Sequence, residues 1–252
     1  MSEPLWRPSP ERIAAANLTA FIDRVNRKRG VGATDFASLW RWSVDDSGAF
    51  WAELWDFCAV IAETRGDRAL VDGDRMPGAR FFPDARLNFA ENLLRRRDDA
   101  PGIVFRREDG LRREMSFAEL ARAVARLAEA LEREGVKPGD RVAGYLPNMP
   151  ETIVAALAAA SIGATWSSCS PDFGERGVLD RFGQIEPVVL FFVDAYVYNG
   201  KAHDSLDRVS SVLEGLPSVR RTVVVPFVSD DPDIADIRGG MLLDDFVAGT
   251  TA

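Results

Sequence analysis

Three loops of this 252-residue sequence carry side chains that could bind an anionic ligand. The loop 170–174 joins an expected strand to an expected helix, and two arginines follow it. The loop 196–201 holds Lys201 beside a glycine turn with tyrosines close by, which makes this lysine a candidate phosphate contact. The loop 147–151 is a candidate by its position. Ligands commonly bind where parallel strands end and helices begin.

Acid-base and metal chemistry have few residues to draw on. The chain has one histidine, His203, and two cysteines, Cys58 and Cys169. Zinc sites need more ligands than these, and the cysteines lie too far apart in the sequence to indicate a disulfide framework. His203 beside Asp204 could act as a general base, but no nucleophile accompanies it. We expect no metal site, and the residues alone indicate anion-receptive loops without a catalytic constellation.

Motif absences and charge exclude several classes of protein. Neither Gly-x-Gly-x-x-Gly nor Gly-x4-Gly-Lys-Ser/Thr occurs, and no lysine follows Gly249-Thr250. A formal charge of -8 and a pI near 4.9 argue against binding to nucleic acid or to an anionic membrane. The longest apolar stretch, 152–164, is shorter than the roughly 20 residues of a membrane span. Residues 1–20 lack the apolar core of a signal peptide, so we expect a cytoplasmic protein.

The elements that must position the loops follow a regular alternation of strands and helices. The stretch 188–193 is apolar throughout, which is typical of a strand covered on both faces. Asp172 to Glu175 has the spacing of a capping box that opens a helix. The alternation predicts an α/β fold with a largely parallel, doubly wound sheet. The predicted strands are 141–146, 164–169, 188–193 and 221–225, and the predicted helices are 150–162, 172–185 and 205–213.

A β-hairpin and a capped helix precede this alternation. Asp109-Gly110 lies between the strand-like runs 103–107 and 111–115, which is a strong hairpin signal. Ser116 and Glu119 then have the spacing of a capping box, and the helix that they open is expected to end at Gly135.

Residues 1–95 differ from the rest because they are rich in tryptophan and mostly helical in pattern. We predict a helix over 50–65 and a short one around 36–40, with a basic helix end at 24–29. The aromatic side chains are expected to fill a small core or a docking face. Mixed charge followed by Pro-Gly predicts a linker over 95–102, which separates a domain at 1–95 from one at 96–252.

Several motifs resemble the acetoacetate branch of the adenylate-forming acyl-CoA synthetase superfamily. Tyr-Leu-Pro-Asn at 145–148 and Ile-Gly-Ala at 162–164 are typical of the superfamily as a whole. More specific are Cys-Ser-Pro-Asp-Phe-Gly at 169–174 and Val-Tyr-Asn-Gly-Lys at 197–201. The stretches 82–94 and 178–182 also carry the resemblance, which runs from about Phe36 to the C-terminus.

This resemblance implies an enzyme that joins acetoacetate to CoA at the expense of ATP, through an acyl-adenylate and with Mg²⁺ on the phosphates. It also implies an acyl-CoA synthetase N-terminal region at 1–95 and the first part of an AMP-binding domain at 96–252. In related synthetases the nucleotide end of CoA contacts a strand-to-helix turn and a basic turn one strand later. The matching residues are Ser170, Pro171, Asp172, Tyr198 and Lys201. Some relatives have glycines at the first turn and arginines at the second, and Asp172 would repel a phosphate that faced it.

The family's phosphate loop, acyl pocket, hinge and C-terminal lysine match no part of the sequence. We therefore expect an incomplete N-terminal portion that carries no catalytic residue and is inactive by itself. Three functions stay open: a ligase for acetoacetate, a ligase for another short acid such as acetate or propionate, and a non-catalytic binding module. Nothing in the sequence sets the oligomeric state.

Overall fold

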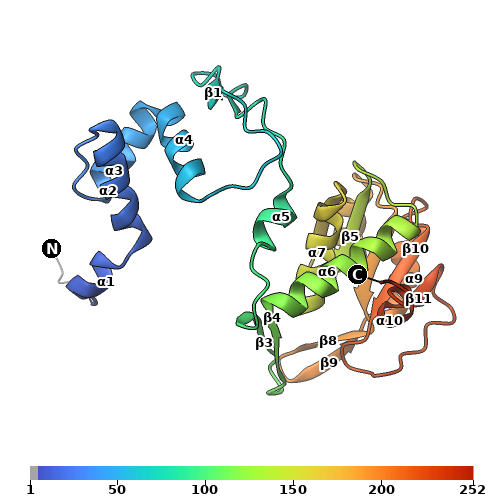
Figure 1. Cartoon of the computed structure of the whole chain (residues 1–252). Coiled ribbons are helices and arrows are strands. Elements are labelled where there is room, and N and C mark those ends of the chain that lie inside the picture. The colour runs from blue at the N-terminus through green and yellow to red at the C-terminus, as the bar shows by residue number, and fades with distance from the viewer. Residues whose placement is uncertain (1–4, 252) are drawn as a thin grey trace. The chain divides into compact units, whose positions relative to one another are not determined.

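The computed structural model describes residues 5–251, and the chain divides into two compact units, Met1–Leu87 and Asn88–Ala252. Figure 1 labels the elements of both units. The first unit has its helices between Pro10 and Phe57, and it also carries one short antiparallel strand pair. Its elements are α1 (Pro10–Ala14), α2 (Asn17–Arg29), α3 (Phe36–Asp45), α4 (Ser47–Phe57), β1 (Leu70–Val71) and β2 (Arg80–Phe81).

Local signals explain where most helices of the first unit begin and end. The predicted basic helix end is confirmed, because α2 finishes at Arg29 and Gly30 adopts the left-handed conformation with φ 66°. The predicted short helix is confirmed as α3. The predicted helix over 50–65 is wrong beyond Phe57, because Ala59 is left-handed with φ 49° and Val60 N–H donates back to the Trp55 carbonyl.

Aliphatic side chains and phenylalanines together form the small core of the first unit. Phe21 and Val25 of α2 are buried, and the Phe21 ring lies 5.1 Å from that of Phe57 and 5.9 Å from that of Phe50. Trp40 and Trp51, by contrast, are 50% and 42% exposed. The predicted small aromatic core is therefore confirmed for the phenylalanines, while these two tryptophans remain largely outside it.

The second unit opens with the predicted hairpin and capped helix. Its first elements are α5 (Phe89–Leu93), β3 (Pro101–Arg106), β4 (Arg112–Ser116) and α6 (Phe117–Arg133). Both halves of the capping box at Ser116 and Glu119 are present. The prediction of a linker over 95–102 is wrong at its end, because Pro101 already pairs with Ser116. Proline is tolerated as the first residue of a strand, and a register shift follows it.

A five-stranded, all-parallel sheet in the order β11-β10-β7-β5-β6 forms the centre of the second unit. Every predicted strand and helix is present within a few residues. The short strand β11, the helix α10 and the hairpin β8–β9 were not predicted. The elements are β5 (Arg141–Tyr145), α7 (Pro150–Ser161), β6 (Thr165–Cys169), α8 (Glu175–Phe182), β7 (Val189–Val193), β8 (Ala195–Tyr198), β9 (Lys201–Asp204), α9 (Leu206–Glu214), β10 (Arg221–Val225), β11 (Gly240–Leu242) and α10 (Leu243–Phe246).

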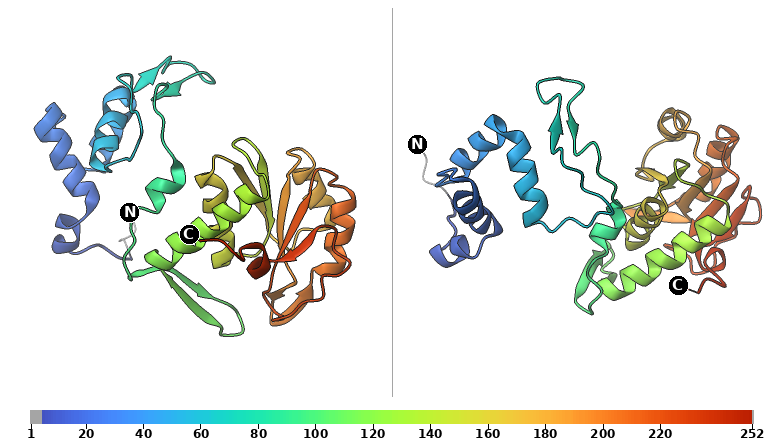
Figure 2. Two further views of the ribbon diagram at one scale, coloured as in Figure 1. Left: turned by 45° about the vertical axis from the view of Figure 1, so that its right-hand side comes forward. Right: turned by 45° about the horizontal axis from the view of Figure 1, so that its top comes forward.

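Helices cover both faces of this sheet, which confirms the doubly wound arrangement. One apolar core combines α6 and α7 with one set of strand residues, such as Phe191 and Val223. A separate core combines α8 and α9 with the alternate residues, such as Phe192 and Val224. Figure 2 shows the sheet between these helices. Because successive side chains of a strand face opposite ways, a fully apolar strand such as β7 serves both cores.

The carboxyl edge of the sheet is the edge that can position a ligand. β5 and β7 are neighbours, yet β5 continues into α7 on one face and β7 continues toward α9 on the other. Ligands in open α/β sheets bind outside the carboxyl ends at such a switch. None of the helices built by residues 5–251 combines the length and apolar character needed to cross a membrane.

Candidate functional site

The first predicted turn, between β6 and α8, is pinned from the inside. The carbonyl oxygens of Pro171 and Phe173 lie 3.0 and 2.5 Å from the Tyr145 hydroxyl. Ser170 and Asp172 are exposed, whereas Pro171 is buried. The predicted capping box at Asp172 is wrong, because Gly174 caps α8 and no side chain bonds to its first turn. The turn therefore offers Ser170 and Asp172 to solvent and keeps its carbonyls inside.

The second predicted turn is a tight β-hairpin. Tyr198 and Lys201 face each other across it, and Asn199 and Gly200 form its tip with φ 50° and 71°. Both central residues are left-handed, as a type I′ hairpin turn requires. The Tyr198 and Lys201 side chains are exposed. The Asn-Gly pair was the sequence signal for this hairpin, but its flanking residues do not alternate in the manner of a half-buried strand.

The single histidine packs against an aromatic ring. His203 of β9 stacks on Tyr196 of β8, with ring centroids 5.0 Å apart and ring planes 18° from parallel. The Gly200 N–H at the hairpin tip donates to the Glu108 carboxylate at 3.1 Å. The hairpin thus carries an aromatic stack on its body and a neighbouring carboxylate at its tip.

Arg208 of α9 was missed by the sequence reasoning, although it bonds to the first predicted turn. Its Nη1 donates to the Pro171 carbonyl at 2.9 Å and to the Tyr145 hydroxyl at 3.0 Å. The hydrogen bond to Tyr145 raises the pKa of Arg208. No local motif marks this arginine, because these partners come from two distant segments of the chain.

Asp194 was also missed, although it ends the most clearly predicted strand. Its side chain is buried directly after β7 and accepts backbone N–H groups of Phe227 at 2.6 Å and Ser229 at 2.7 Å. Its own carbonyl accepts the N–H of Ser205, where α9 begins. Asp194 therefore fixes the loop after β10 and the start of α9 beside the hairpin.

The remaining candidates are placed in structural roles. Glu151 of the loop 147–151 pairs with Arg113 at 2.7 Å. Burial raises the pKa of the Cys169 thiol to about 11, so this cysteine is a protonated thiol rather than a nucleophile near neutral pH. Between residues 5 and 251, no three His, Cys, Asp or Glu side chains gather in a group that could hold a metal ion.

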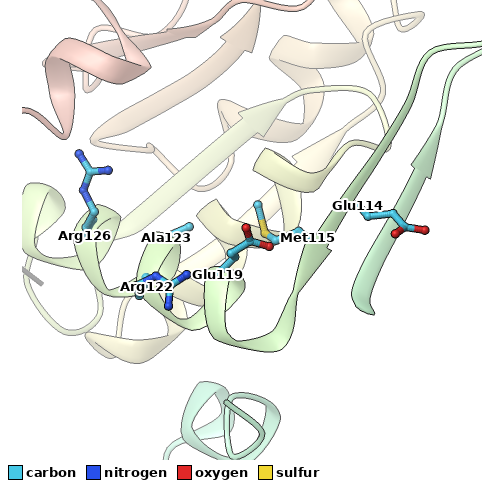
Figure 3. Close-up of a pocket in the computed structure, with 6 residues that line it drawn as sticks. All are labelled: Glu114, Met115, Glu119, Arg122, Ala123 and Arg126. Atoms are coloured by element: carbon cyan, nitrogen blue, oxygen red, sulfur yellow. The ribbon is translucent and has the colours of Figure 1, made fainter. Parts of the chain in front are cut away.

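Two hollows of the second unit lie away from the predicted CoA residues. Figure 3 shows a hollow of about 370 Å³ between β4 and α6, lined by Glu114, Met115, Glu119, Arg122, Ala123 and Arg126. A smaller one of about 170 Å³ lies next to it and reaches Phe191 and Val225 of the sheet. Neither contains Ser170, Asp172, Tyr198 or Lys201.

Comparisons with known proteins identify two families that match parts of the chain. Residues 89–239 match the AMP-binding enzyme family, and residues 36–93 match the acetyl-coenzyme A synthetase N-terminus. The chain is 48% identical to an acetoacetyl-coenzyme A synthetase of Rhizobium meliloti (strain 1021), over 99% of this chain and 38% of the relative. It is 36% identical to a malonamoyl-CoA synthetase of Penicillium aethiopicum, over 90% of this chain and 32% of the relative.

A solved structure is also similar to this chain in fold and in sequence. The acetoacetyl-CoA synthetase from Streptomyces lividans superimposes with a TM-score of 0.89 and is 43% identical, covering 100% of this chain and 39% of that chain. The chain thus spans about two fifths of the length of this relative. Since the family match extends over more than half of the chain, the chain belongs to the AMP-binding enzyme family.

Proposed function

We propose that this chain is the N-terminal part of an ATP-dependent ligase that makes acetoacetyl-CoA from acetoacetate and CoA. The observation that carries the proposal is the 48% identity to an acetoacetyl-coenzyme A synthetase over 99% of the chain. The exposed polar turns at the carboxyl edge of the sheet support it, because they leave Ser170, Asp172, Tyr198 and Lys201 open to a ligand.

The proposed reaction has two balanced steps. A carboxylate oxygen of acetoacetate attacks the α-phosphorus of ATP, and pyrophosphate leaves. The CoA thiolate then attacks the carbonyl carbon of the adenylate, and AMP leaves. Mg²⁺ bound to the ATP phosphates would neutralise part of their charge.

Within this reaction, the described residues serve the nucleotide end of CoA. Lys201 supplies a cation for a phosphate, and the Tyr198 ring beside it supplies an exposed surface for a base. Ser170 and Asp172 supply polar contacts from the first turn, with Asp172 facing a hydroxyl or amino group rather than a phosphate. Pro171 is buried, so it acts through the shape of the turn.

A second candidate is a ligase for a different short acid. It is favoured by the match to a malonamoyl-CoA synthetase, which covers 90% of this chain at 36% identity. The same N-terminal architecture therefore occurs in proteins named for different acyl groups.

Pyrophosphate exchange tests both candidates in a longer protein that contains this chain. Acetoacetate, acetate, propionate, butyrate and malonamate are supplied in parallel. Exchange strongest with acetoacetate supports the first candidate, and exchange strongest with another acid supports the second. Absence of exchange with every acid contradicts both and favours a non-catalytic binding module.

The variant Lys201→Ala tests the CoA assignment. A charge-assisted hydrogen bond contributes roughly 1.5–3 kcal/mol, so we expect the KM for CoA to rise about tenfold or more. Adenylate formation, measured by pyrophosphate exchange, should be unchanged. Lys137→Ala is the matched control, because Lys137 is exposed and precedes β5 at the opposite edge of the sheet. Exchange that falls as much as thioester formation would contradict the assignment.

A further inference from the structure

Arg208 has a place in the fold that the proposed function leaves unused. Its guanidinium reaches from the first turn of α9 to the end of β5 and to the turn after β6. Both segments lie at the carboxyl edge of the sheet. Since α9 directly follows the hairpin β8–β9, one half-buried side chain joins the first turn to the helix that continues from the hairpin.

The contacts to the first turn fix the direction of its peptide groups. The Pro171 carbonyl lies 2.9 Å from Arg208 Nη1, and the Phe173 carbonyl lies 3.5 Å from it. In a trans peptide the N–H points opposite to the carbonyl. Because both carbonyls point inward, the N–H groups of Asp172 and Gly174 point away from Arg208. The arginine therefore sets which side of the turn presents hydrogen-bond donors.

The link to the hairpin runs through the chain, because β9 ends at Asp204 and α9, which carries Arg208, begins at Leu206. Within the hairpin, Tyr196 stacks on His203, and its strand leads directly to Tyr198 and Lys201 at the tip. The Tyr145 hydroxyl and the Pro171 and Phe173 carbonyls, to which Arg208 donates, are neutral oxygens. They do not cancel its positive charge, which keeps its attraction for a polyanion.

We propose that Arg208 is a positioning residue for CoA binding, which rests on the proposed function. It holds the turn 170–174 and the hairpin 195–204 in one arrangement, so that both contact the same nucleotide. Small displacements of positioning groups have large kinetic effects, and loss of Arg208 should act on CoA before it acts on the acid or on ATP.

The test compares Arg208→Gln with a matched arginine variant in the longer protein. Arg238 also donates to two backbone carbonyls, those of Leu213 and Leu216, at 2.7 and 2.8 Å. Those carbonyls lie at the far end of α9, so Arg238→Gln removes the same kind of bond away from the carboxyl edge. We expect Arg208→Gln to raise the KM for CoA about tenfold, while pyrophosphate exchange and the KM for ATP stay within about twofold. Arg238→Gln should leave the KM for CoA unchanged.

Two further variants keep the proposal falsifiable if Arg208→Gln folds poorly. Arg208→Lys keeps the charge but loses the planar fork, so it should recover part of the CoA affinity. Tyr145→Phe keeps the ring and removes only the hydroxyl, so it should raise the KM for CoA by a smaller factor. A wild-type KM for CoA in Arg208→Gln, or an equal loss in both half-reactions in all three variants, would overturn the role. Failure of the proposed function appears separately, as a wild-type protein that forms no thioester.

Discussion

Two buried carboxylates, one in each unit, show different ways of compensating a charge. Glu53 of α4 and Asp194 after β7 are both only 4% exposed. Glu53 is surrounded by side-chain cations from α2, with Arg24 at 3.1 Å, Arg29 at 2.9 Å and Lys28 at 3.8 Å. Asp194 accepts three consecutive backbone N–H groups, those of 227, 228 and 229. One carboxylate fixes a pair of helices, and the other fixes a loop beside the candidate site.

The difference decides what happens when each carboxylate is lost. The cations around Glu53 end flexible side chains that are 24–51% exposed, so they can turn toward water. The backbone N–H groups around Asp194 cannot leave without moving the loop that carries them. A donor left unsatisfied inside the protein costs about 1–3 kcal/mol. Loss of Asp194, which is compensated by backbone groups, should therefore lower the free energy of unfolding more than loss of Glu53.

The largest effect is expected from Asp194→Ala. It removes the acceptor of three N–H groups, and we expect the free energy of unfolding to fall by about 4 kcal/mol. Urea denaturation gives the total, and hydrogen exchange in β7 and β10 locates the loss. Asp194→Asn keeps one acceptor oxygen, so it should lose about half as much. A loss below about 1 kcal/mol in Asp194→Ala would contradict the proposed difference between compensation by backbone groups and compensation by side-chain cations.

Glu53→Gln should cost less, about 2 kcal/mol, because its cationic partners can reach solvent. Hydrogen exchange of the amides in α2 and α4 should rise, while exchange in the parallel sheet stays unchanged. Asp45→Asn is the control, since Asp45 is exposed at the end of α3 and should change stability by less than about 0.5 kcal/mol. If Glu53→Gln were as costly as Asp194→Ala, side-chain mobility would not explain the comparison.

The same two residues show how far sequence reasoning reaches. The basic run 24–29 was recognised as the end of a helix, and the structure confirms that end at Gly30. Its second role, surrounding Glu53, depends on a helix that begins 17 residues after Gly30. Asp194 leaves no sequence signal at all, because its partners are backbone groups that every residue except proline possesses.

The candidate site follows the same rule. The two turns were predicted because local motifs mark them. The sheet was predicted because apolar runs such as 188–193 are typical of strands covered on both faces. Arg208 was missed because its partners are distant in sequence and are mostly carbonyl and hydroxyl oxygens. The end of α4 was missed because a left-handed alanine ends it rather than a glycine. Local signals therefore predict elements, while long-range hydrogen bonds decide how those elements meet.

The pH dependence of the first unit sharpens the comparison further. Burial raises the pKa of Glu53, but hydrogen bonds from Arg29 and Arg24 and the charge of Lys28 outweigh it, so the pKa lies below its usual value. A lowered pKa means that the charged form is favoured by folding. Its contribution is complete above the unfolded pKa of about 4.3 and is lost as the pH falls through the folded value. The protection of the amides in α2 and α4 against exchange, relative to the unfolded chain at the same pH, should therefore fall as the pH drops below the unfolded value, and Glu53→Gln should weaken this dependence.

Lys28→Gln should give the smallest effect of the set. The Lys28 ammonium lies 3.8 Å from Glu53, and its side chain is 51% exposed, so solvent and salt screen the pair. We expect a loss of about 0.3 kcal/mol at low ionic strength, and no measurable loss in about 1 M salt, where the screening length is roughly 3 Å. Arg29→Gln, which removes a hydrogen bond of 2.9 Å, should cost more under both conditions. Equal losses for the two variants would mean that Glu53 responds to the total positive charge around it rather than to hydrogen-bond geometry. The electrostatic field of these cations would then be what stabilises the charged form of Glu53.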